Sequence, residues 1–255
     1  MRFVLIHGGF HGAWCWDRVI PELEKLGHAG IAIDLPGHGS RRDERSTLAD
    51  RRDAILEVLE PGDVLVGHSG GGYDICVAAN AAIDRVGHLV FLAAGLPIEG
   101  KTIVEATGGA QDNNDGAVTQ LMDDETGMLG FLRTTDDGRL EVCDPEKAKG
   151  FFYHDCDEAT VRWAYDRLTP APLLFNTEAI HVPDFWSAQL PRSFILCEQD
   201  RAMPTSMSDQ VIQRLGVNPV LIDASHSPFF SKPAELVDAL MRAVDSVPVG
   251  PLSPR

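Results

Sequence analysis

A serine surrounded by glycines is the feature of this sequence best suited to carry out chemistry. Residues 67–72 read Gly-His-Ser-Gly-Gly-Gly, directly after the apolar run Asp63–Val66 and directly before a helical pattern that opens at Tyr73. A G-x-S-x-G pattern between a strand and a helix is typical of a nucleophile elbow, a sharp turn that leaves the serine hydroxyl exposed. Gly67 and Gly71 supply the small neighbours that such a turn needs. The pattern alone also fits an ordinary glycine-rich turn, so the interpretation of Ser69 as a nucleophile depends on its partners.

A serine hydroxyl is a weak nucleophile until a base accepts its proton, and that base is usually a histidine oriented by a carboxylate. Among the nine histidines, His226 comes shortly after the apolar run Val220–Ile222. Loops at the carboxyl ends of parallel strands converge on one edge of the sheet, so we expect His226 to reach Ser69 there. The alternative is a loop histidine held by structural hydrogen bonds.

The orienting acid is expected between the serine and the histidine in the chain, after an earlier strand. Asp200 follows the apolar run that ends at Cys197 and fits this place. Glu198 and Asp223 are competing candidates, but Glu198 is still close to its strand and Asp223 lies on one. The residue types and their order therefore favour Asp200.

Acyl-transfer chemistry also needs N–H groups where negative charge develops on the carbonyl oxygen. The residue after the nucleophile, Gly70, supplies one backbone N–H. The second is expected from the loop after the first strand, His7-Gly8-Gly9-Phe10. Gly9 is the first choice and Phe10 the second, while His7 is expected to hold the loop by side-chain hydrogen bonds.

Alternating apolar strands and amphipathic helices must position these residues, and they predict an α/β fold with a mostly parallel central sheet and helices on both faces. The predicted strands are 3–6, 31–35, 64–66, 89–93, 193–197 and 220–222. The predicted helices are 16–26, 48–59, 73–83, 204–215 and 233–244.

The alternation breaks between residues 97 and 189, a stretch too long for a simple crossover. We interpret 97–189 as an inserted cap over a core formed by 1–96 and 190–246, with a flexible tail at 247–255. Within the cap, an Asp-Gly turn between 130–134 and 139–142 indicates a hairpin. A helix is expected over 157–168, with Asp157 as its N-cap.

The composition is that of a soluble globular protein, with 255 residues, 24% charged and 44% hydrophobic. No apolar stretch reaches the length that spans a bilayer, so no membrane association is expected. The sequence shows no signal peptide. Five cysteines, odd in number and without metal-type spacing, are expected to be reduced thiols in a cytoplasmic protein. Neither a dinucleotide fingerprint nor a metal cluster is evident, so no cofactor or metal is expected.

The net charge of −16 argues against a nucleic-acid partner, which would require a basic face. The segment 97–189 has 18 acidic and 7 basic side chains and carries most of this charge. A solvated, solubilising surface is the simpler interpretation. The alternative is that this segment overhangs the site and disfavours anionic substrates.

The motifs together resemble a known family. The run 3–14, the pairs and loops Gly27-His28 and Asp34-Leu35-Pro36-Gly37-His38-Gly39, and the elbow resemble α/β-hydrolases of the plant methylesterase and hydroxynitrile lyase group and their bacterial esterase relatives. The segments 198–200 and 225–233 resemble the acid and histidine segments of that group, whereas the cap resembles it weakly. The resemblance implies an α/β-hydrolase fold with Ser69, Asp200 and His226 as catalytic triad and the amides of Gly9 and Gly70 as oxyanion hole.

The same resemblance separates two chemistries. The lyases of the group carry a threonine and a lysine at positions that correspond to Gly8 and Ser227 of this chain. Without that lysine, no positive charge stands ready to stabilise a departing cyanide. The resemblance therefore favours an esterase over a lyase.

We thus expect a serine hydrolase that cleaves a small neutral carboxylic ester with an apolar or aromatic acyl part, such as a methyl ester or lactone. Phe10, Trp163 and Met203 are the candidate substrate-binding residues. The competing hypotheses are a ligand-sensing protein on this fold with little turnover, a hydroxynitrile lyase and a cofactor-free oxygenase. The sequence does not indicate an oligomeric state.

Overall fold

The computed structural model describes residues 1–108, 127–172 and 177–254 and contains one six-stranded sheet. The sheet order is β2-β1-β3-β4-β7-β8, and every neighbouring pair is parallel. Its strands are β1 (Arg2–Ile6), β2 (Ala29–Ile33), β3 (Asp63–His68), β4 (Val86–Leu92), β7 (Arg192–Cys197) and β8 (Val220–Ile222). The predicted parallel α/β architecture is confirmed.

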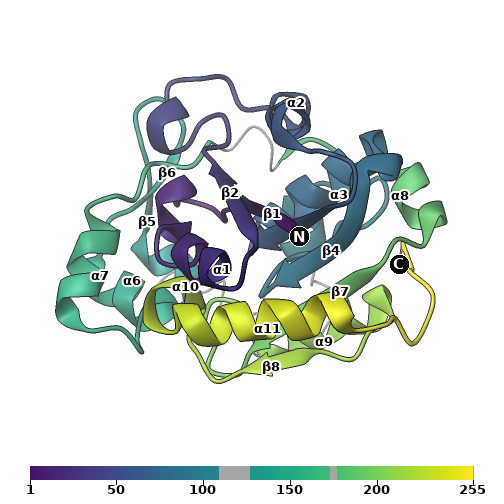
Figure 1. The fold of residues 1–255 in the computed structure, drawn as a ribbon. Coiled ribbons are helices and arrows are strands. Elements are labelled where there is room, and N and C mark those ends of the chain that lie inside the picture. Colours follow the sequence, from purple (N-terminus) through teal and green to yellow (C-terminus); the bar gives the residue numbers. More distant parts are fainter. Residues whose placement is uncertain (109–126, 173–176, 255) are drawn as a thin grey trace.

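Helices cover both faces of this sheet. They are the short α1 (Ile20–Lys25) and the longer α2 (Leu48–Val58), α3 (Gly71–Ala81), α9 (Thr205–Leu215) and α11 (Pro233–Asp245). Successive residues of a strand point to opposite faces. Accordingly Val4 and Ile6 of β1 pack in one core cluster with α2, α3 and α9, whereas Phe3 and Leu5 pack in the other with α1 and α11. Figure 1 shows α2 and α3 on the opposite side of the sheet from α11.

Short helical segments fill several connections between these elements. They are the 3-10 helices η1 (Ala13–Trp16), η2 (Gly39–Arg41), η3 (Ile83–Arg85) and η4 (Met128–Phe131) and the single-turn helix α10 (Pro228–Ser231). Most of them are too short to give a periodic apolar pattern, and α10 was not anticipated from the sequence.

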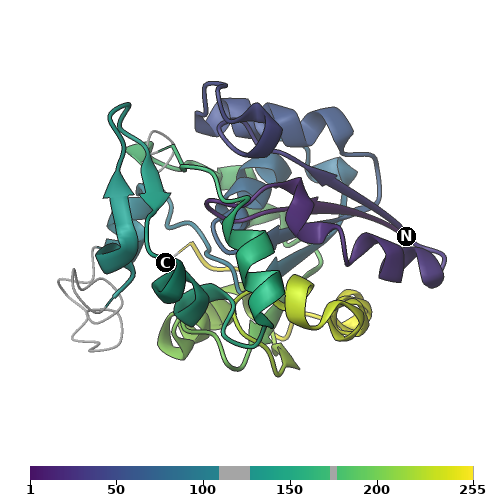
Figure 2. The ribbon, with the colours of Figure 1, turned by 90° about the vertical axis from the view of Figure 1, so that its left-hand side faces the viewer.

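Between β4 and β7 the chain leaves the sheet. The described elements there are α4 (Ile103–Gly108), β5 (Leu132–Thr134), β6 (Leu140–Val142), α6 (Pro145–Phe152), α7 (Glu158–Tyr165) and α8 (Pro183–Ala188). β5 and β6 form the expected antiparallel hairpin, and the Asp157 side chain caps α7 by accepting a hydrogen bond from the amide of Thr160 at 2.7 Å. Figure 2 shows the hairpin at one side of the molecule, near α6 and α7 and away from the α2 and α11 layers.

Helix α8 lies apart from this group, although it falls inside the range expected for the cap. The Asn80 side chain of α3 accepts hydrogen bonds from the amides of Asp184 and Phe185, at 2.9 and 3.1 Å. Phe185 and Trp186 are buried in the core cluster of α2 and α3. The end of the inserted segment therefore packs against α3 of the core, while the division into core and cap stays a prediction.

The C-terminal segment, expected to be a flexible tail, packs on the core in the structure. The carbonyl of Gly250 accepts a hydrogen bond from the buried Arg192 guanidinium at 2.7 Å. The amide of Ser253 donates to the carbonyl of Arg214 at 2.8 Å, and Leu252 is buried. Composition alone did not reveal these anchors, because the donors lie on distant elements.

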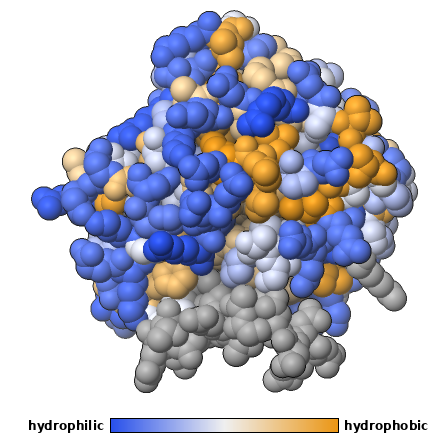
Figure 3. All heavy atoms as spheres, turned by 90° about the horizontal axis from the view of Figure 1, so that it is seen from below, coloured by the Kyte–Doolittle hydropathy of each residue, from blue (hydrophilic) through white to orange (hydrophobic). Residues whose placement is uncertain are grey.

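The lower face of the molecule, which carries β8, α9 and α11 in Figure 1, is largely hydrophilic with hydrophobic side chains gathered in its middle (Figure 3). β8 is the edge strand on this side and has only three residues. A short edge strand offers few unpaired backbone groups to another chain. Within the described ranges, no helix has both the length and the apolar composition required to cross a bilayer.

A buried ion pair joins the two helices on one face of the sheet. Arg51 of α2 donates from Nε and Nη2 to the two carboxylate oxygens of Asp74 on α3, at 2.7 and 2.6 Å. Both side chains are at most 2% exposed. A two-point contact of this kind sets the register between α2 and the helix that follows the elbow.

Replacing Asp74 by Ala should lower the free energy of unfolding by about 3–5 kcal/mol, because the Arg51 charge stays buried and loses the carboxylate that it pairs with. The matched control is Asp53→Ala on α2, the helix that carries Arg51, because the Asp53 carboxylate pairs with Arg52 at the surface. That change should cost less than about 1 kcal/mol. Urea denaturation of both variants measures the difference, and equal costs would contradict the assignment.

Candidate functional site

Ser69 lies at the turn between β3 and α3, in a strained backbone conformation with φ of +53°. Its amide donates to the carbonyl of Leu92 at 3.1 Å. Its carbonyl accepts from the amides of Gly72 and Gly95, at 3.1 and 3.0 Å. These bonds tie the turn to the end of β4 and the loop after it. The geometry is that of a nucleophile elbow.

Glycines make the approach of the surrounding backbone possible. A Cβ on Gly67 would lie 2.6 Å from the carbonyl oxygen of Gly71, and one on Gly8 would lie 2.8 Å from Cβ of Ser69. Real Cβ atoms do not tolerate such distances. The left-handed conformation itself falls on Ser69, so the glycines serve chiefly to provide space.

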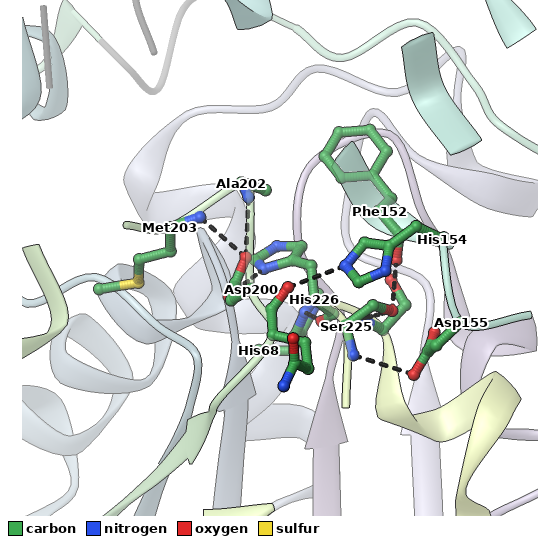
Figure 4. A network of polar contacts seen from close by, with 11 residues as sticks. His68, Phe152, His154, Asp155, Asp200, Ala202, Met203, Ser225 and His226 are labelled. Atoms are coloured by element: carbon green, nitrogen blue, oxygen red, sulfur yellow. Dashed lines mark hydrogen bonds and ion pairs between the residues drawn. The ribbon is translucent and has the colours of Figure 1, made fainter. Parts of the chain in front are cut away.

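Asp200 and His226 lie at the same edge of the sheet and are hydrogen bonded. Nδ1 of His226 is 2.7 Å from Oδ2 of Asp200, and both side chains are nearly buried. The other oxygen, Oδ1, accepts from the amides of Ala202 and Met203, at 2.8 and 2.9 Å (Figure 4). Since a carboxylate is acceptor-only, Nδ1 of His226 carries the proton, and Nε2 presents a lone pair.

The competing acids occupy other places. Glu198 is exposed. The Asp223 carboxylate accepts from Nε2 of Gln199 at 3.1 Å and pairs with Lys232 at 3.3 Å. Of the three acidic residues considered from the sequence, Asp200 is the one that contacts His226 among the described hydrogen bonds.

Ser69 and His226 line one cavity of about 70 Å³. Its other lining residues are Gly9, Phe10, His11, His68, Phe152 and Ala202. Among described contacts, the Ser69 hydroxyl and His226 make no hydrogen bond to each other. Hydrogen bonds between a nucleophile and its base are often long before substrate binds and tighten in the complex.

Two backbone N–H groups close to Ser69 in the described structure are left without a hydrogen-bond acceptor. Within the described part of the chain, neither the amide of Gly9 nor that of Gly70 donates a hydrogen bond. The two segments lie side by side, since a Cβ on Gly70 would be 3.8 Å from the nitrogen of Gly9. Paired free amides beside a serine hydroxyl are the arrangement that can stabilise an oxyanion.

The substrate-binding residues suggested by the sequence are not all brought to this cavity. Phe10 lines it, with φ of +65°. Trp163 does not; its ring packs edge-on against Trp14 with centroids 5.4 Å apart and lies under the Arg167 guanidinium. Met203 does not line it either, and contributes its amide to Asp200 instead.

Sequence reasoning missed three lining residues, namely His11, His68 and Ala202. A sequence signal existed for His68, which is the variable residue before the serine in the elbow motif. In the structure its Nε2 donates to the carbonyl of His226 at 2.9 Å. Burial holds the pKa of His68 well below its ordinary value, so this ring stays neutral.

Four consecutive residues, Phe152–Asp155, connect the inserted segment to the loops that carry Asp200 and His226, and we call them the clasp. The carbonyl of Phe152 accepts from Oγ of Ser225 at 3.0 Å. His154 donates from Nε2 to the carbonyl of Gln199 at 2.8 Å. Figure 4 shows these side chains gathered round the loops that carry Asp200 and His226.

Asp155 completes the clasp. Its Oδ2 accepts from the amide of Ser225 at 2.9 Å and from Oγ of Ser231 at 2.8 Å. Burial alone would raise the pKa of Asp155, but these hydrogen bonds outweigh it and hold the pKa below the ordinary value. The carboxylate therefore stays ionised and accepts a hydrogen bond from Ser225, the residue that precedes His226.

The described residues contain no group of three His, Cys, Asp or Glu side chains that could hold a metal ion. The chemistry that this site can perform with its own side chains is nucleophilic attack by a serine, with His226 as base and two amides as oxyanion donors.

Comparison with known proteins places this geometry in context. The model of the alpha/beta hydrolase family matches residues 3–239. Methylesterase 9 of Arabidopsis thaliana is 32% identical, over 97% of this chain and 99% of its own. Norfluorocurarine synthase 1 of a Strychnos species is 28% identical, over 96% of both chains.

Solved structures show the same fold. The crystal structure of polyneuridine aldehyde esterase superimposes with a TM-score of 0.77 at 23% identity, and covers 94% of this chain and 98% of its own. The family predicted from the motifs is thereby confirmed, together with the fold.

Replacing Gly8 by Ala should displace Ser69, because the new Cβ would lie 2.8 Å from Cβ of Ser69 and 3.0 Å from Nδ1 of His68. We expect the rate at which a fluorophosphonate labels Ser69 to fall by about 10²-fold, as misplaced reacting groups generally do. Gly150→Ala is the control, since no atom lies within 4 Å of its new Cβ. Labelling of Gly8→Ala at the wild-type rate would refute this packing argument.

Buried histidines should make the protein labile in acid. Burial lowers the pKa of His7 and His88 to about 4 and that of His11 to about 3. Above an unfolded value of about 6.5 these rings are neutral in both states; below it the unfolded chain binds protons that the folded chain rejects. Stability is therefore retained above about pH 6.5 and is lost as pH falls toward 4, by about 1.4 kcal/mol per pH unit for each histidine.

Denaturant titrations at pH 7, 6 and 5 measure this loss. His88 does not line the cavity. In a His88→Gln variant the free energy of unfolding should fall less steeply with decreasing pH, by the contribution of one histidine. Equal stability from pH 7 to pH 5 would contradict the buried, neutral state of these rings.

Proposed function

The chain belongs to the alpha/beta hydrolase family, and we propose that it hydrolyses neutral carboxylic esters through an acyl-enzyme on Ser69. The observation that carries the proposal is the Asp200–His226 pair beside a serine held on a strained elbow. A relative named methylesterase and a structural neighbour named esterase support the same class of reaction.

In the proposed reaction, Nε2 of His226 accepts the Ser69 proton as Oγ attacks the ester carbonyl. The amides of Gly9 and Gly70 donate to the oxyanion of the tetrahedral intermediate. His226 then returns the proton to the leaving alcohol, which leaves an acyl group on Oγ. Water, deprotonated by the same histidine, releases the acid and restores the serine.

Asp200 has two tasks in this proposal. It fixes the tautomer of His226 by accepting from Nδ1, and it stabilises the imidazolium that forms during each proton transfer. The amides of Ala202 and Met203 occupy its other oxygen, so the carboxylate cannot rotate away without losing two hydrogen bonds.

The lining of the cavity supports a neutral substrate with an apolar acyl part. Phe10, Phe152 and Ala202 contribute apolar surface, and none of the residues that line it is a lysine or arginine. Ser227, next to the proposed base, is fully buried and carries no charge. This lining gives no cation for a carboxylate substrate or for a departing cyanide, so it favours ester hydrolysis over cyanohydrin cleavage.

Replacing Ser69 by Ala should reduce turnover of p-nitrophenyl esters by roughly 10⁴-fold or more, because the nucleophile is lost. Ser187→Ala is the matched control, since this exposed hydroxyl donates to the Asp184 carbonyl away from the cavity. Circular dichroism and thermal unfolding check that both variants fold. Retained turnover in Ser69→Ala would refute the proposal, and stoichiometric labelling of the wild type without turnover would assign a ligand-binding role instead.

A further inference from the structure

His11 uses both of its ring nitrogens in the fold. Nδ1 is 2.8 Å from the carbonyl oxygen of Gly9, and Nε2 is 2.7 Å from Oη of Tyr153 in the clasp. A carbonyl can only accept, so Nδ1 carries the proton, and Nε2 accepts from the tyrosine hydroxyl. The chain of donors therefore runs from Tyr153 through His11 to the Gly9 carbonyl.

Hydrogen bonds from histidines hold two successive carbonyls of the loop after β1, those of Gly8 and Gly9. His7 donates from Nδ1 to the carbonyl of Gly8 at 2.8 Å, while its Nε2 accepts from the amide of Leu35 at 3.1 Å. Both peptide planes that flank Gly9 are thus fixed by histidines. His7 is anchored by Leu35, which follows β2, and His11 is anchored by Tyr153 in the inserted segment.

Because residue 9 is a glycine, its backbone needs such restraint more than the backbone of another residue type would at this position. Glycine has the widest backbone freedom, and no atom lies within 4 Å of a Cβ built at this position. Local packing therefore does not determine its φ and ψ. An oxyanion donor must nevertheless be in place before charge develops.

We propose that Tyr153 and His11 are positioning residues that hold the Gly9 amide in line for the oxyanion. Tyr153 acts through His11 and touches neither the ester nor Ser69. The inference rests on the proposed function, because it assigns a purpose to a hydrogen bond beside the proposed oxyanion hole. It also makes the inserted segment a part of the catalytic apparatus.

Burial keeps this relay in one protonation state. It lowers the pKa of His11 to about 3 and raises that of Tyr153 well above its ordinary value. A positive charge on His7 or His226 would lower the pKa of His11 further. The hydrogen bonds therefore run from Tyr153 to His11 and from His11 to the Gly9 carbonyl throughout the neutral pH range.

Replacing Tyr153 by Phe removes the hydroxyl and keeps the ring. We expect kcat for a p-nitrophenyl ester to fall about 10-fold with KM changed by less than about 2-fold, a smaller loss than deleting a donor outright. The rate of Ser69 labelling by a fluorophosphonate and the affinity for a trifluoromethyl ketone should fall by the same factor. A merely structural tyrosine would lower the melting temperature and leave these ratios unchanged.

Tyr165→Phe is the matched control, because that hydroxyl donates to the carbonyl of Val142 within the inserted segment. It should change none of the three rates or affinities. His11→Asn, whose side-chain amide replaces the Nδ1 donor, should lose less activity than His11→Leu. Equal losses in the two His11 variants would overturn the proposal.

A measurement on the backbone separates this inference from the proposed function. The ¹⁵N order parameter of the Gly9 amide should fall from the value of rigid backbone, about 0.85, to below about 0.7 in Tyr153→Phe. This readout needs neither turnover nor labelling. A wild type that hydrolyses no ester would refute the proposed function alone, whereas an unchanged Gly9 amide in Tyr153→Phe would refute the positioning role.

Discussion

The site depends on how closely three stretches of backbone approach one another around Ser69. The turn after β3, the loop after β1 and the loop after β4 meet where a single added Cβ, at Gly8 or Gly67, would collide with its neighbours. A left-handed serine costs of order 1–3 kcal/mol and persists only where surrounding contacts over-determine it. Here the amide of Ser69 donates to Leu92, the last residue of β4, and its carbonyl accepts from Gly72 in α3 and from Gly95 after β4. The contacts with neighbouring segments therefore hold Ser69 in its strained conformation and so fix the direction of its hydroxyl.

Backbone strain collects at this edge of the sheet. Among the non-glycine residues that the structure describes, four have positive φ, and Phe10, Ser69 and Ala93 are three of them. Phe10 and Ser69 line the cavity, and Ala93 directly follows the residue whose carbonyl holds the Ser69 amide. Such clustering is typical of functional sites, where unusual conformations aim groups that a relaxed chain would not.

Much of the architecture follows from local patterns. Each of the six sheet strands was anticipated within about three residues at either end, because an apolar run bounded by turn residues is a strong signal. Helices α4, α6, α8 and α10 were not anticipated. The shorter three, α4, α8 and α10, have too few turns to establish a period, and α8 is stabilised by contacts with α3 that no local pattern reveals.

The candidate site divides along the same line. Ser69, Asp200 and His226 could be predicted to meet because chain order and strand ends restrict where such residues lie. Trp163 does not line the cavity, since an aromatic residue on a helix packs against its neighbours as readily as it lines a cavity. The contact between Tyr153 and His11 joins residues 142 positions apart, and only tertiary structure shows it.

The clasp changes how this molecule divides into exchangeable parts. Strands β5 and β6 of the hairpin pair mainly with each other. None of the clasp hydrogen bonds to the proposed catalytic loops involves the hairpin. Phe152–Asp155, by contrast, is hydrogen bonded to the loops that carry the proposed base and the proposed acid. For grafting between relatives, the natural junction therefore lies before α6, so that the hairpin can be replaced while the clasp stays with the sheet. A junction placed at the ends of β4 and β7 would exchange the clasp together with the hairpin and so break its hydrogen bonds to the loops that carry Asp200 and His226.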